Sequence, residues 1–340
     1  MEREKVRQMA RDMLLARRFE ERAGQAYSEG ACGGFLHLYP GEEAVAVGVL
    51  HAAEPSDYVV STYRDHVHAL VKGMPPGRVM AELFGRRDGC DRGMGGSMHL
   101  FDRERRLMGG YAIVGETFPI AIGIAYGIAL RKLAEAVICF FGDGATNQGT
   151  CHESLNMAAL WRLPVLFVCE NNRYQIGTEI HRHAAVTEIY KRACAYGMPG
   201  ESADGMDVLA VHEVAERMLR AIRAGQGPQL LELNTYRFRG HSMADAGAYR
   251  PRAEVEAFKH LEPLRRVEHD LAAQTERLRG THAALDDATL ERLRDDVERI
   301  VEEAVAFARA SPPPTLADAW DVFHAGRQQE VLVRAERAHA

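Results

Sequence analysis

The sequence predicts a three-layer α/β fold, with helices on both faces of a mostly parallel sheet. Residues 136–141 (AVICFF) and 164–169 (PVLFVC) are short, continuous apolar runs, which are typical of strands buried on both faces. The segment between them, 150–161, has a helical pattern, so the three predict a β–α–β unit with parallel strands and a right-handed crossover. A second helix and strand, 208–224 and 229–234, extend the same alternation.

The N-terminal part predicts two helices and a strand ahead of this unit. Apolar residues recur at three- and four-residue steps through the first thirty positions, which indicates an amphipathic helix; they are Val6, Met9, Met13 and Ala16. A glycine-bearing loop at 30–40 separates this helix from a second one at 42–50. A short strand at 57–62 follows, and residues 85–99, with five glycines and two aspartates, predict an irregular loop.

Residues 117–133 are apolar nearly all round and predict a buried helix. Gly123 and Gly127 lie four positions apart, so they share one face of a helix and allow a neighbour to pack closely. The longest weakly polar stretch, 112–130, contains Glu116, Pro119 and several glycines, so a membrane span is not expected.

The C-terminal part predicts a long amphipathic helix at 286–310, with Asp286 or Asp287 as its N-cap. Three prolines after Ser311 end it. We expect a cofactor-binding α/β domain over residues 1–270, a helical extension over 271–325 and a flexible tail over 326–340.

Composition excludes some functional classes. The 340 residues carry 42 basic and 48 acidic side chains, a net charge of −6, and a nucleic-acid-binding protein would show a basic excess. The six cysteines form no C-x-x-C pair, which favours free thiols in a reducing compartment. The N-terminus lacks the apolar segment of a secretory signal. We therefore expect a cytoplasmic protein without nucleic-acid or membrane partners.

Polar residues follow both strands of the central β–α–β unit. Gly142-Asp143-Gly144 comes after the first strand and Asn171-Asn172 after the second, with residues 145–170 between them. Carboxyl ends of parallel strands meet at one sheet edge, where ligands bind. A carboxylate, an amide oxygen and a backbone carbonyl suit Mg²⁺ together with phosphate oxygens and water. A GDG tripeptide alone is more often a tight turn, but the pair of motifs is hard to explain as two turns.

The spacing and the flanks of these motifs resemble those of a thiamine-diphosphate enzyme, the α subunit of the E1 component of 2-oxo acid dehydrogenase complexes. The likeness runs from the first helix to about Arg250. It rests on these segments: 37–44 (HLYPGEEA), 63–66 (YRDH), 93–99 (GMGGSMH), 141–149 (FGDGATNQG), 153–161 (ESLNMAALW), 170–174 (ENNRY) and 236–242 (YRFRGHS). The resemblance implies a thiamine-diphosphate-binding fold.

The resemblance also implies roles for individual residues. Mg²⁺ would be bound by the side chains of Asp143 and Asn172 and by the backbone carbonyl of Tyr174. The diphosphate would be bound by the glycine turn, which comprises Gly142, Asp143, Gly144 and Ala145. Three side chains would also reach it, those of Tyr63, Arg64 and His241. The backbone at Ala112 and Val114 would contact the aminopyrimidine ring. His37 and His241 would line the active site and orient substrate or move protons.

The resemblance further implies oxidative decarboxylation of a small 2-oxo acid and transfer of the acyl group to the lipoyl domain of an E2 component. The glutamate that activates thiamine diphosphate lies in the β subunit of two-subunit family members. This chain has no second α/β half to supply one, so we expect an α₂β₂ heterotetramer with an E1 β subunit.

Several alternatives stay open at this stage. Pyruvate is the favoured substrate because segments 63–68 and 107–110 look most like pyruvate dehydrogenase. An acetoin dehydrogenase α subunit is next, and a branched-chain 2-oxo acid dehydrogenase third. A non-catalytic cofactor-binding paralogue and an Mg²⁺-dependent phosphohydrolase are different classes, and the number of matching motifs disfavours the second.

Other polar residues have simpler explanations. His66, His68 and His99 are interpreted first as loop histidines satisfied by backbone, and Glu170 as a residue that supports the site from behind. Ser242 lies where some mitochondrial relatives are phosphorylated, and we interpret it as structural or phosphate-lining.

Overall fold

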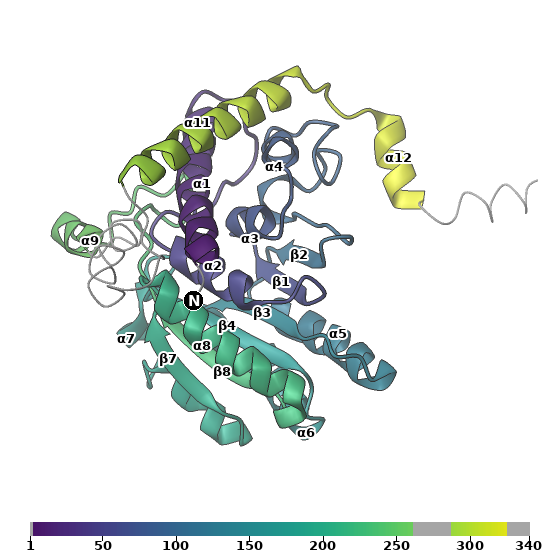
Figure 1. The fold of residues 1–340 in the computed structure, drawn as a ribbon, viewed down its shortest axis with the longest axis vertical. Helices are drawn as coiled ribbons and strands as arrows, with labels where there is room; N and C mark the ends of the chain where they lie inside the picture. Colours follow the sequence, from purple (N-terminus) through teal and green to yellow (C-terminus); the bar gives the residue numbers. More distant parts are fainter. Residues whose placement is uncertain (1–2, 261–286, 325–340) are drawn as a thin grey trace, which may run out of the picture.

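The computed structural model describes residues 3–260 and 287–324 of the chain. Its centre is a six-stranded sheet in the order β2-β1-β3-β4-β8-β7, in which every neighbouring pair is parallel (Figure 1). The strands are β1 (Tyr58–Thr62), β2 (Leu107–Tyr111), β3 (Val137–Gly142), β4 (Val165–Asn171), β7 (Gly200–Asp204) and β8 (Gln229–Asn234). A separate hairpin pairs β5 (Tyr174–Gln175) with β6 (Thr178–Glu179).

Helices cover both faces of the sheet, which confirms the predicted three-layer α/β fold. The α-helices are α1 (Arg3–Ser28), α2 (Glu43–Ala52), α3 (His66–Val71), α4 (Pro76–Leu83), α5 (Thr117–Arg131), α6 (Gly149–Leu160), α7 (Ile180–His183), α8 (Val208–Ala221), α9 (Arg252–Lys259), α11 (Asp287–Ala310) and α12 (Leu316–His324). Short 3₁₀ turns include Gly96–Met98, Asp143–Asn147 and Ile189–Tyr196.

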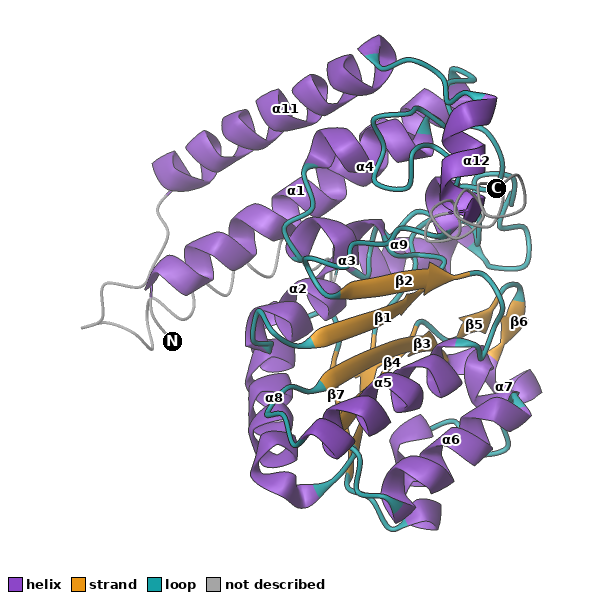
Figure 2. Cartoon of the chain, turned by 90° about the vertical axis from the view of Figure 1, so that its right-hand side faces the viewer, coloured by secondary structure: helices purple, strands orange, loops and turns teal. Residues whose placement is uncertain are grey.

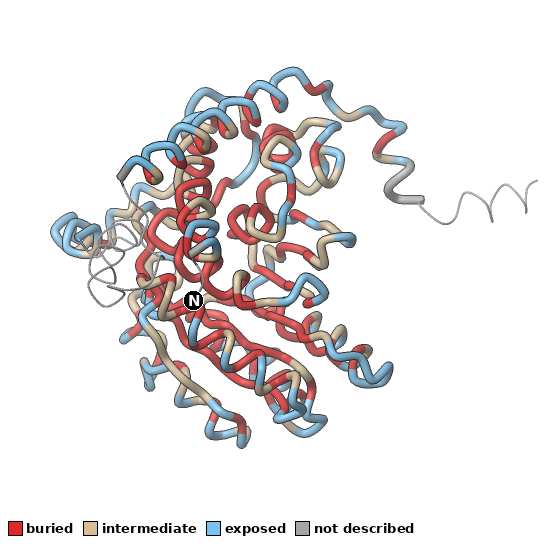
Figure 3. Tube along the Cα trace, viewed as in Figure 1, coloured by how far each residue is buried: buried red, intermediate tan, exposed pale blue. Residues whose placement is uncertain are grey.

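Two hydrophobic cores, one on each face, hold the layers together. Successive strand residues alternate between them: Ile138 and Phe140 belong to the core with α1, α2, α8 and α11, whereas Val137, Cys139 and Phe141 belong to the core with α5 and α6. The central strands are buried along their length (Figure 3). This alternation on a fully buried strand explains the continuous apolar runs of the sequence.

The first helix and the long C-terminal helix pack together, although they lie far apart in the sequence. Figure 2 shows α11 running along α1, away from the sheet. Val297 and Val301 of α11 and Met9 and Met13 of α1 belong to the same core. The predicted apolar stripes of both helices are therefore confirmed. Asp286, residue 270 and the tail from 326 lie outside the described residues, so the domain division stays a prediction.

Two strands of the sheet were not predicted from the sequence. β2 reads LMGGY, and its paired glycines hide the strand signal. β7 reads GESAD and lies at the edge of the sheet, where it is never fully buried. An edge strand needs no apolar run, so the sequence carries only a weak signal for it.

The helix predicted at 117–133 exists as α5, but the expectation that it is buried all round is wrong. Phe118, Ala121 and Ala125 are buried against the sheet, whereas Tyr126 and Leu130 are exposed. A Cβ atom added at Gly123 or Gly127 would meet nothing within 4 Å among the described residues. The small-residue face of this helix is therefore not covered within the described part of the chain.

The irregular loop predicted at 85–99 is confirmed, and a single buried side chain organises it. Glu82, at the end of α4, is fully buried. Its Oε2 accepts hydrogen bonds from the backbone N–H groups of Asp91 (2.9 Å) and Gly93 (2.8 Å), and its Oε1 from those of Gly95 (2.9 Å) and Gly96 (3.0 Å). The carboxylate thus replaces the backbone partners that an irregular loop lacks.

Candidate active site

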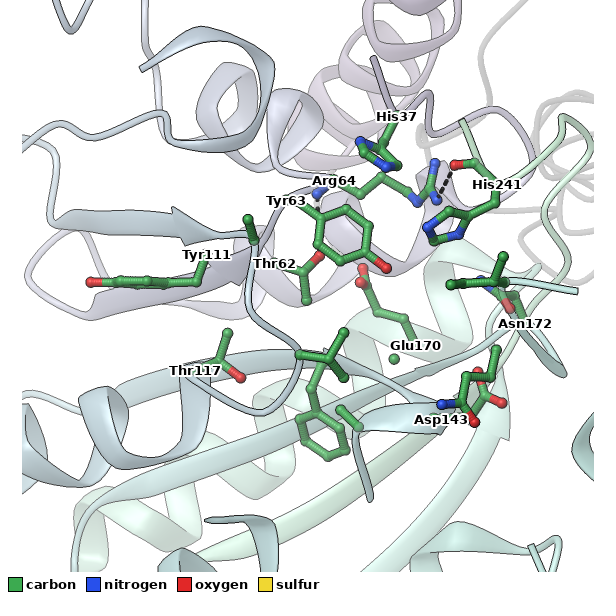
Figure 4. A pocket seen from close by; sticks show the side chains of 18 of the residues that line it. His37, Thr62, Tyr63, Arg64, Tyr111, Thr117, Asp143, Glu170, Asn172 and His241 are labelled. Atoms are coloured by element: carbon green, nitrogen blue, oxygen red, sulfur yellow. Dashed lines mark hydrogen bonds between the residues drawn. The ribbon is translucent and has the colours of Figure 1, made fainter. Parts of the chain in front are cut away.

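A cavity of about 420 Å³ opens at the carboxyl ends of the parallel strands. Residues that follow β1, β2, β3, β4 and β8 line it, and it lies where the strand order reverses between β1 and β3 (Figure 4). Ligands of open α/β sheets bind at such reversals. Its volume falls in the range of roughly 300–1,000 Å³ that small-molecule sites occupy.

Every site residue that the sequence analysis singled out lines this one cavity. They are His37, Tyr63, Arg64, Ala112, Val114, Gly142, Asp143, Gly144, Ala145, Asn172, Tyr174 and His241. They come from segments up to about 200 residues apart in sequence, and the parallel sheet brings them together. Their individual roles stay predictions.

The expected metal ligands lie on two neighbouring turns. Asp143 begins the 3₁₀ turn after β3, and its Oδ2 accepts a hydrogen bond from His183 Nε2 at 2.9 Å. Asn172 lies just beyond β4, where its Oδ1 accepts from the backbone N–H of Tyr174 (3.1 Å) and its Nδ2 donates to Glu42 Oε1 (3.0 Å). Both side chains are buried, and these hydrogen bonds hold each of them in place.

The turn after β3 also fits a phosphate group. The first N–H groups of a helical turn have no partner inside it, and here they belong to Asp143, Gly144 and Ala145, which line the cavity. A Cβ atom at Gly144 would lie 2.5 Å from Gln175 Cγ. Only glycine therefore allows this turn to approach the β5–β6 hairpin so closely.

Several buried polar atoms of the cavity wall have no hydrogen-bond partner among the described residues. They are His37 Nδ1, Glu42 Oε2 and His241 Nδ1. Buried polar groups are nearly always hydrogen-bonded in native proteins, so three atoms around one cavity that lack a hydrogen bond are consistent with a polar ligand. The donor set and these atoms together fit a metal-bound diphosphate cofactor.

Three aromatic side chains form a cluster at one end of the cavity. The ring of His37 lies 4.6 Å from that of Tyr63 and 5.1 Å from that of His241, measured between centroids. Burial, with the nearby Arg64 guanidinium, lowers the pKa of His37 to about 3 and that of His241 to about 3. Both imidazoles are therefore neutral near pH 7 and can accept a proton or a hydrogen bond.

These lowered pKa values predict how stability depends on pH. An unfolded chain binds a proton at each histidine near pH 6.5, whereas the folded chain does so only near pH 3. Lowering the pH from 7 to 4.5 should therefore favour the unfolded state. In urea unfolding at pH 7, 6 and 5, His37→Gln should lose less stability than the wild type; parallel losses would contradict the neutral assignment.

Arg64 ties two loops together at the cavity wall. It is 5% exposed, and its guanidinium donates to the backbone carbonyls of Leu38 and, at 2.9 Å, His241. Its Nε lies 3.7 Å from Glu42 Oε2. Arg64 therefore positions the loops that carry His37 and His241, in addition to lining the cavity.

Two kinds of cavity residue were not predicted from the sequence. Glu42 is a buried carboxylate whose pKa burial raises, although the Arg64 charge opposes the change. At the mouth of the cavity, Phe35, Ile113 and Ile176 expose 62%, 69% and 59% of their surface. No sequence pattern marks Phe35, Ile113 and Ile176, because each lies in a loop without periodicity.

Comparison with known proteins identifies the relatives of this chain. The family model of the dehydrogenase E1 component matches residues 11–317. The chain belongs to this family. It is 46% identical over 314 residues to a pyruvate dehydrogenase E1 component subunit alpha of Porphyra purpurea. The aligned region covers 90% of this chain and 89% of the relative. The protein of the same name from Rhizobium meliloti (strain 1021) is 45% identical over 309 residues, 91% of this chain and 86% of the relative.

The relatives confirm the resemblance stated from the sequence motifs, that of an E1 α subunit. A third relative, the pyruvate dehydrogenase E1 component subunit alpha of Zymomonas mobilis, is 45% identical over 315 residues, 92% of this chain and 86% of the relative. Membership of the E1 family implies the use of thiamine diphosphate.

Three histidines near the E1 cavity serve the structure instead of lining the cavity. His66 is buried, with Nδ1 2.9 Å from Glu20 Oε1 and Nε2 2.8 Å from Ser97 Oγ. His68 lies edge-on to Tyr39 and Phe140. His99 Nδ1 lies 3.1 Å from the carbonyl of Gly110. None of the three lines the cavity, but only His99 is a loop histidine satisfied by backbone as predicted. His66 and His68 lie in α3, and neither ring nitrogen of His68 has a hydrogen-bond partner among the described residues.

Glu170 lines the cavity and also contacts residues behind the cavity wall, which supports the site. Its carboxylate accepts a hydrogen bond from the Tyr39 hydroxyl, and His68 Nε2 lies 3.4 Å away. Ser242 also lines the cavity.

None of the helices in residues 3–260 and 287–324 is long and apolar enough to span a bilayer.

Proposed function

We propose that this chain is the α subunit of a pyruvate dehydrogenase E1 component, which acts with thiamine diphosphate and Mg²⁺ on pyruvate and passes the acetyl group to a lipoyl group of E2. The observation that carries the proposal is the convergence of Asp143, Asn172 and His241 on one cavity in a chain about 45% identical to proteins with that name. Hard oxygen ligands at the strand ends favour Mg²⁺.

In this proposal each element of the cavity has a defined task, and His241 has two. Asp143, Asn172 and the Tyr174 carbonyl hold the metal, and the N–H groups of Gly144 and Ala145, with Tyr63, Arg64 and His241, hold the diphosphate. The backbone at Ala112 and Val114 meets the aminopyrimidine ring. When bound, thiamine diphosphate supplies a nucleophilic carbon and an electron sink for decarboxylation. Neutral His37 and His241 orient the 2-oxo acid and accept or return protons.

An α₂β₂ assembly with an E1 β subunit completes the proposal. The apolar mouth of the cavity, at Phe35, Ile113 and Ile176, is exposed, and a second exposed apolar face lies on α5 at Tyr126 and Leu130. Large apolar patches mark interaction surfaces. We assign both to subunit contacts. The compartment we propose is the cytoplasm, in keeping with six free cysteines.

Dye-reduction activity tests this function directly. The chain, with and without its β subunit, would be given Mg²⁺, thiamine diphosphate and one of three substrates: pyruvate, acetoin or a branched-chain 2-oxo acid. We expect activity with pyruvate, and only when the β subunit is present. A preference for acetoin or for the branched-chain acid would change the substrate, and cofactor binding without any turnover would indicate a non-catalytic paralogue.

His241→Ala should reduce turnover strongly without unfolding the protein. A positioned acid–base side chain contributes roughly 10²–10⁴-fold to a rate, so we expect kcat at saturating cofactor to fall by at least about 100-fold. Thermal unfolding and steady-state kinetics of the αβ assembly check both parts. His260→Ala, the same change at an exposed position, is the control. Wild-type kcat in His241→Ala would remove this residue from the reaction.

A further inference from the structure

His183 makes a contact that none of the predicted site roles includes. It is the last residue of α7, and its side chain is 7% exposed. Its Nε2 lies 2.9 Å from Oδ2 of Asp143, whose side chain is 3% exposed. The two residues are 40 positions apart in sequence, so only the fold brings them together.

The hydrogen bonds around His183 determine which ring nitrogen carries the proton. Asn147 Nδ2 lies 3.1 Å from the backbone carbonyl of His183 and 3.1 Å from its Nδ1. A carbonyl oxygen only accepts, so the Asn147 atom facing it must be the NH₂ group. That group then donates to Nδ1 as well. The remaining nitrogen, Nε2, carries the hydrogen and donates it to Asp143.

This chain of hydrogen bonds joins the two segments that carry the expected metal ligands. Asp143 and Asn147 are the two ends of one 3₁₀ turn. His183 ends the segment that starts at Asn172 and passes through Tyr174 and the β5–β6 hairpin. The bond to His183 uses Oδ2 of Asp143, and no described residue hydrogen-bonds to Oδ1. One carboxylate oxygen is thus fixed by the protein and the other is left for the cavity.

We propose that His183 is a positioning residue for the metal–diphosphate site. It orients the Asp143 carboxylate and holds the 172–183 segment against the Asp143 turn before the cofactor arrives. Partners that orient metal ligands from behind typically change metal affinity by about 10–100-fold when removed. The inference rests on the proposed function, because it takes Asp143 as a ligand of Mg²⁺.

The test measures the Mg²⁺ concentration that gives half-maximal binding of thiamine diphosphate, by titration calorimetry on the αβ assembly. His183→Phe fills the space but cannot donate, and we expect it to need at least about ten times more Mg²⁺. In His183→Gln the side-chain amide can reach the position of Nε2–H and should restore most of the affinity. His181→Phe is the matched control, because His181 lies on the same helix with a side chain 64% exposed.

A second readout follows the segment itself. Without cofactor, limited proteolysis should cut the 173–188 region faster in His183→Phe than in the wild type or in His181→Phe. At saturating Mg²⁺ and cofactor, kcat of His183→Phe should be close to that of the wild type, which separates a positioning role from a catalytic one. Unchanged Mg²⁺ dependence in His183→Phe would overturn this inference alone. A wild-type assembly that binds thiamine diphosphate without Mg²⁺ would overturn the proposed metal site as well.

Discussion

Asp143→Ala is expected to abolish Mg²⁺-dependent binding of thiamine diphosphate. The substitution removes the only carboxylate among the three proposed metal ligands, and hard cations depend on such charged oxygen donors. Removal of a residue that only orients a metal ligand weakens metal binding by about 10–100-fold. Loss of the ligand itself should therefore weaken binding by more than about 100-fold. Calorimetric titration of the αβ assembly with thiamine diphosphate, at fixed Mg²⁺, measures the effect.

The fold should survive this change at a modest cost. Asp143→Ala leaves His183 Nε2 without its acceptor, and an unpaired buried donor costs about 1–3 kcal/mol. Asp295→Ala makes the same substitution at an exposed position of α11 and should bind cofactor as the wild type does. Wild-type affinity in a folded Asp143→Ala protein would refute the metal assignment.

Glu82→Gln is expected to have the largest effect on stability. The two side chains have nearly the same shape, but the amide turns an acceptor oxygen into an NH₂ group. That group would face two of the four backbone N–H donors that now converge on the carboxylate. Hydrogen bonds to charged groups contribute about 1.5–3 kcal/mol each, so loss of two should cost about 3–6 kcal/mol. Such a loss is a large part of the free energy of unfolding of a typical domain.

Urea unfolding and limited proteolysis would measure this effect. We expect a lower unfolding midpoint and faster cleavage within residues 89–96. Glu104→Gln, an exposed glutamate in a nearby loop, should leave both unchanged. If Glu82→Gln matched that control, the four hydrogen bonds would not be what holds the loop.

Local sequence patterns were enough to predict the central strands and the longer helices, but not α3, α4, α7, α9, α12 or the β5–β6 hairpin. The strands at 137–142 and 165–171 are buried on both faces, so their composition reports burial directly. The helices α1 and α11 each show one apolar stripe because each covers a core on one side. β2 and β7 were not predicted, because glycines in β2 and the edge position of β7 weaken the apolar pattern of a strand.

The site residues were predictable for a related reason. Asp143 and Asn172 directly follow buried strands, and parallel strands deliver their carboxyl ends to one edge. His37 and His241 were found only through the resemblance to E1 α subunits, because loop residues have no periodicity of their own. That each lines the same cavity is a property of the folded chain.

The sequence by itself determined the fold class, the buried strands β3 and β4 and the polar residues Asp143 and Asn172 that follow them, because those signals are local. Only the tertiary structure decided that Glu42 enters the cavity wall, that His183 donates to Asp143 and that one face of α5 is exposed. These features depend on contacts between segments tens of residues apart. Such contacts follow from how helices and loops pack on the sheet, and no short pattern in the sequence specifies them.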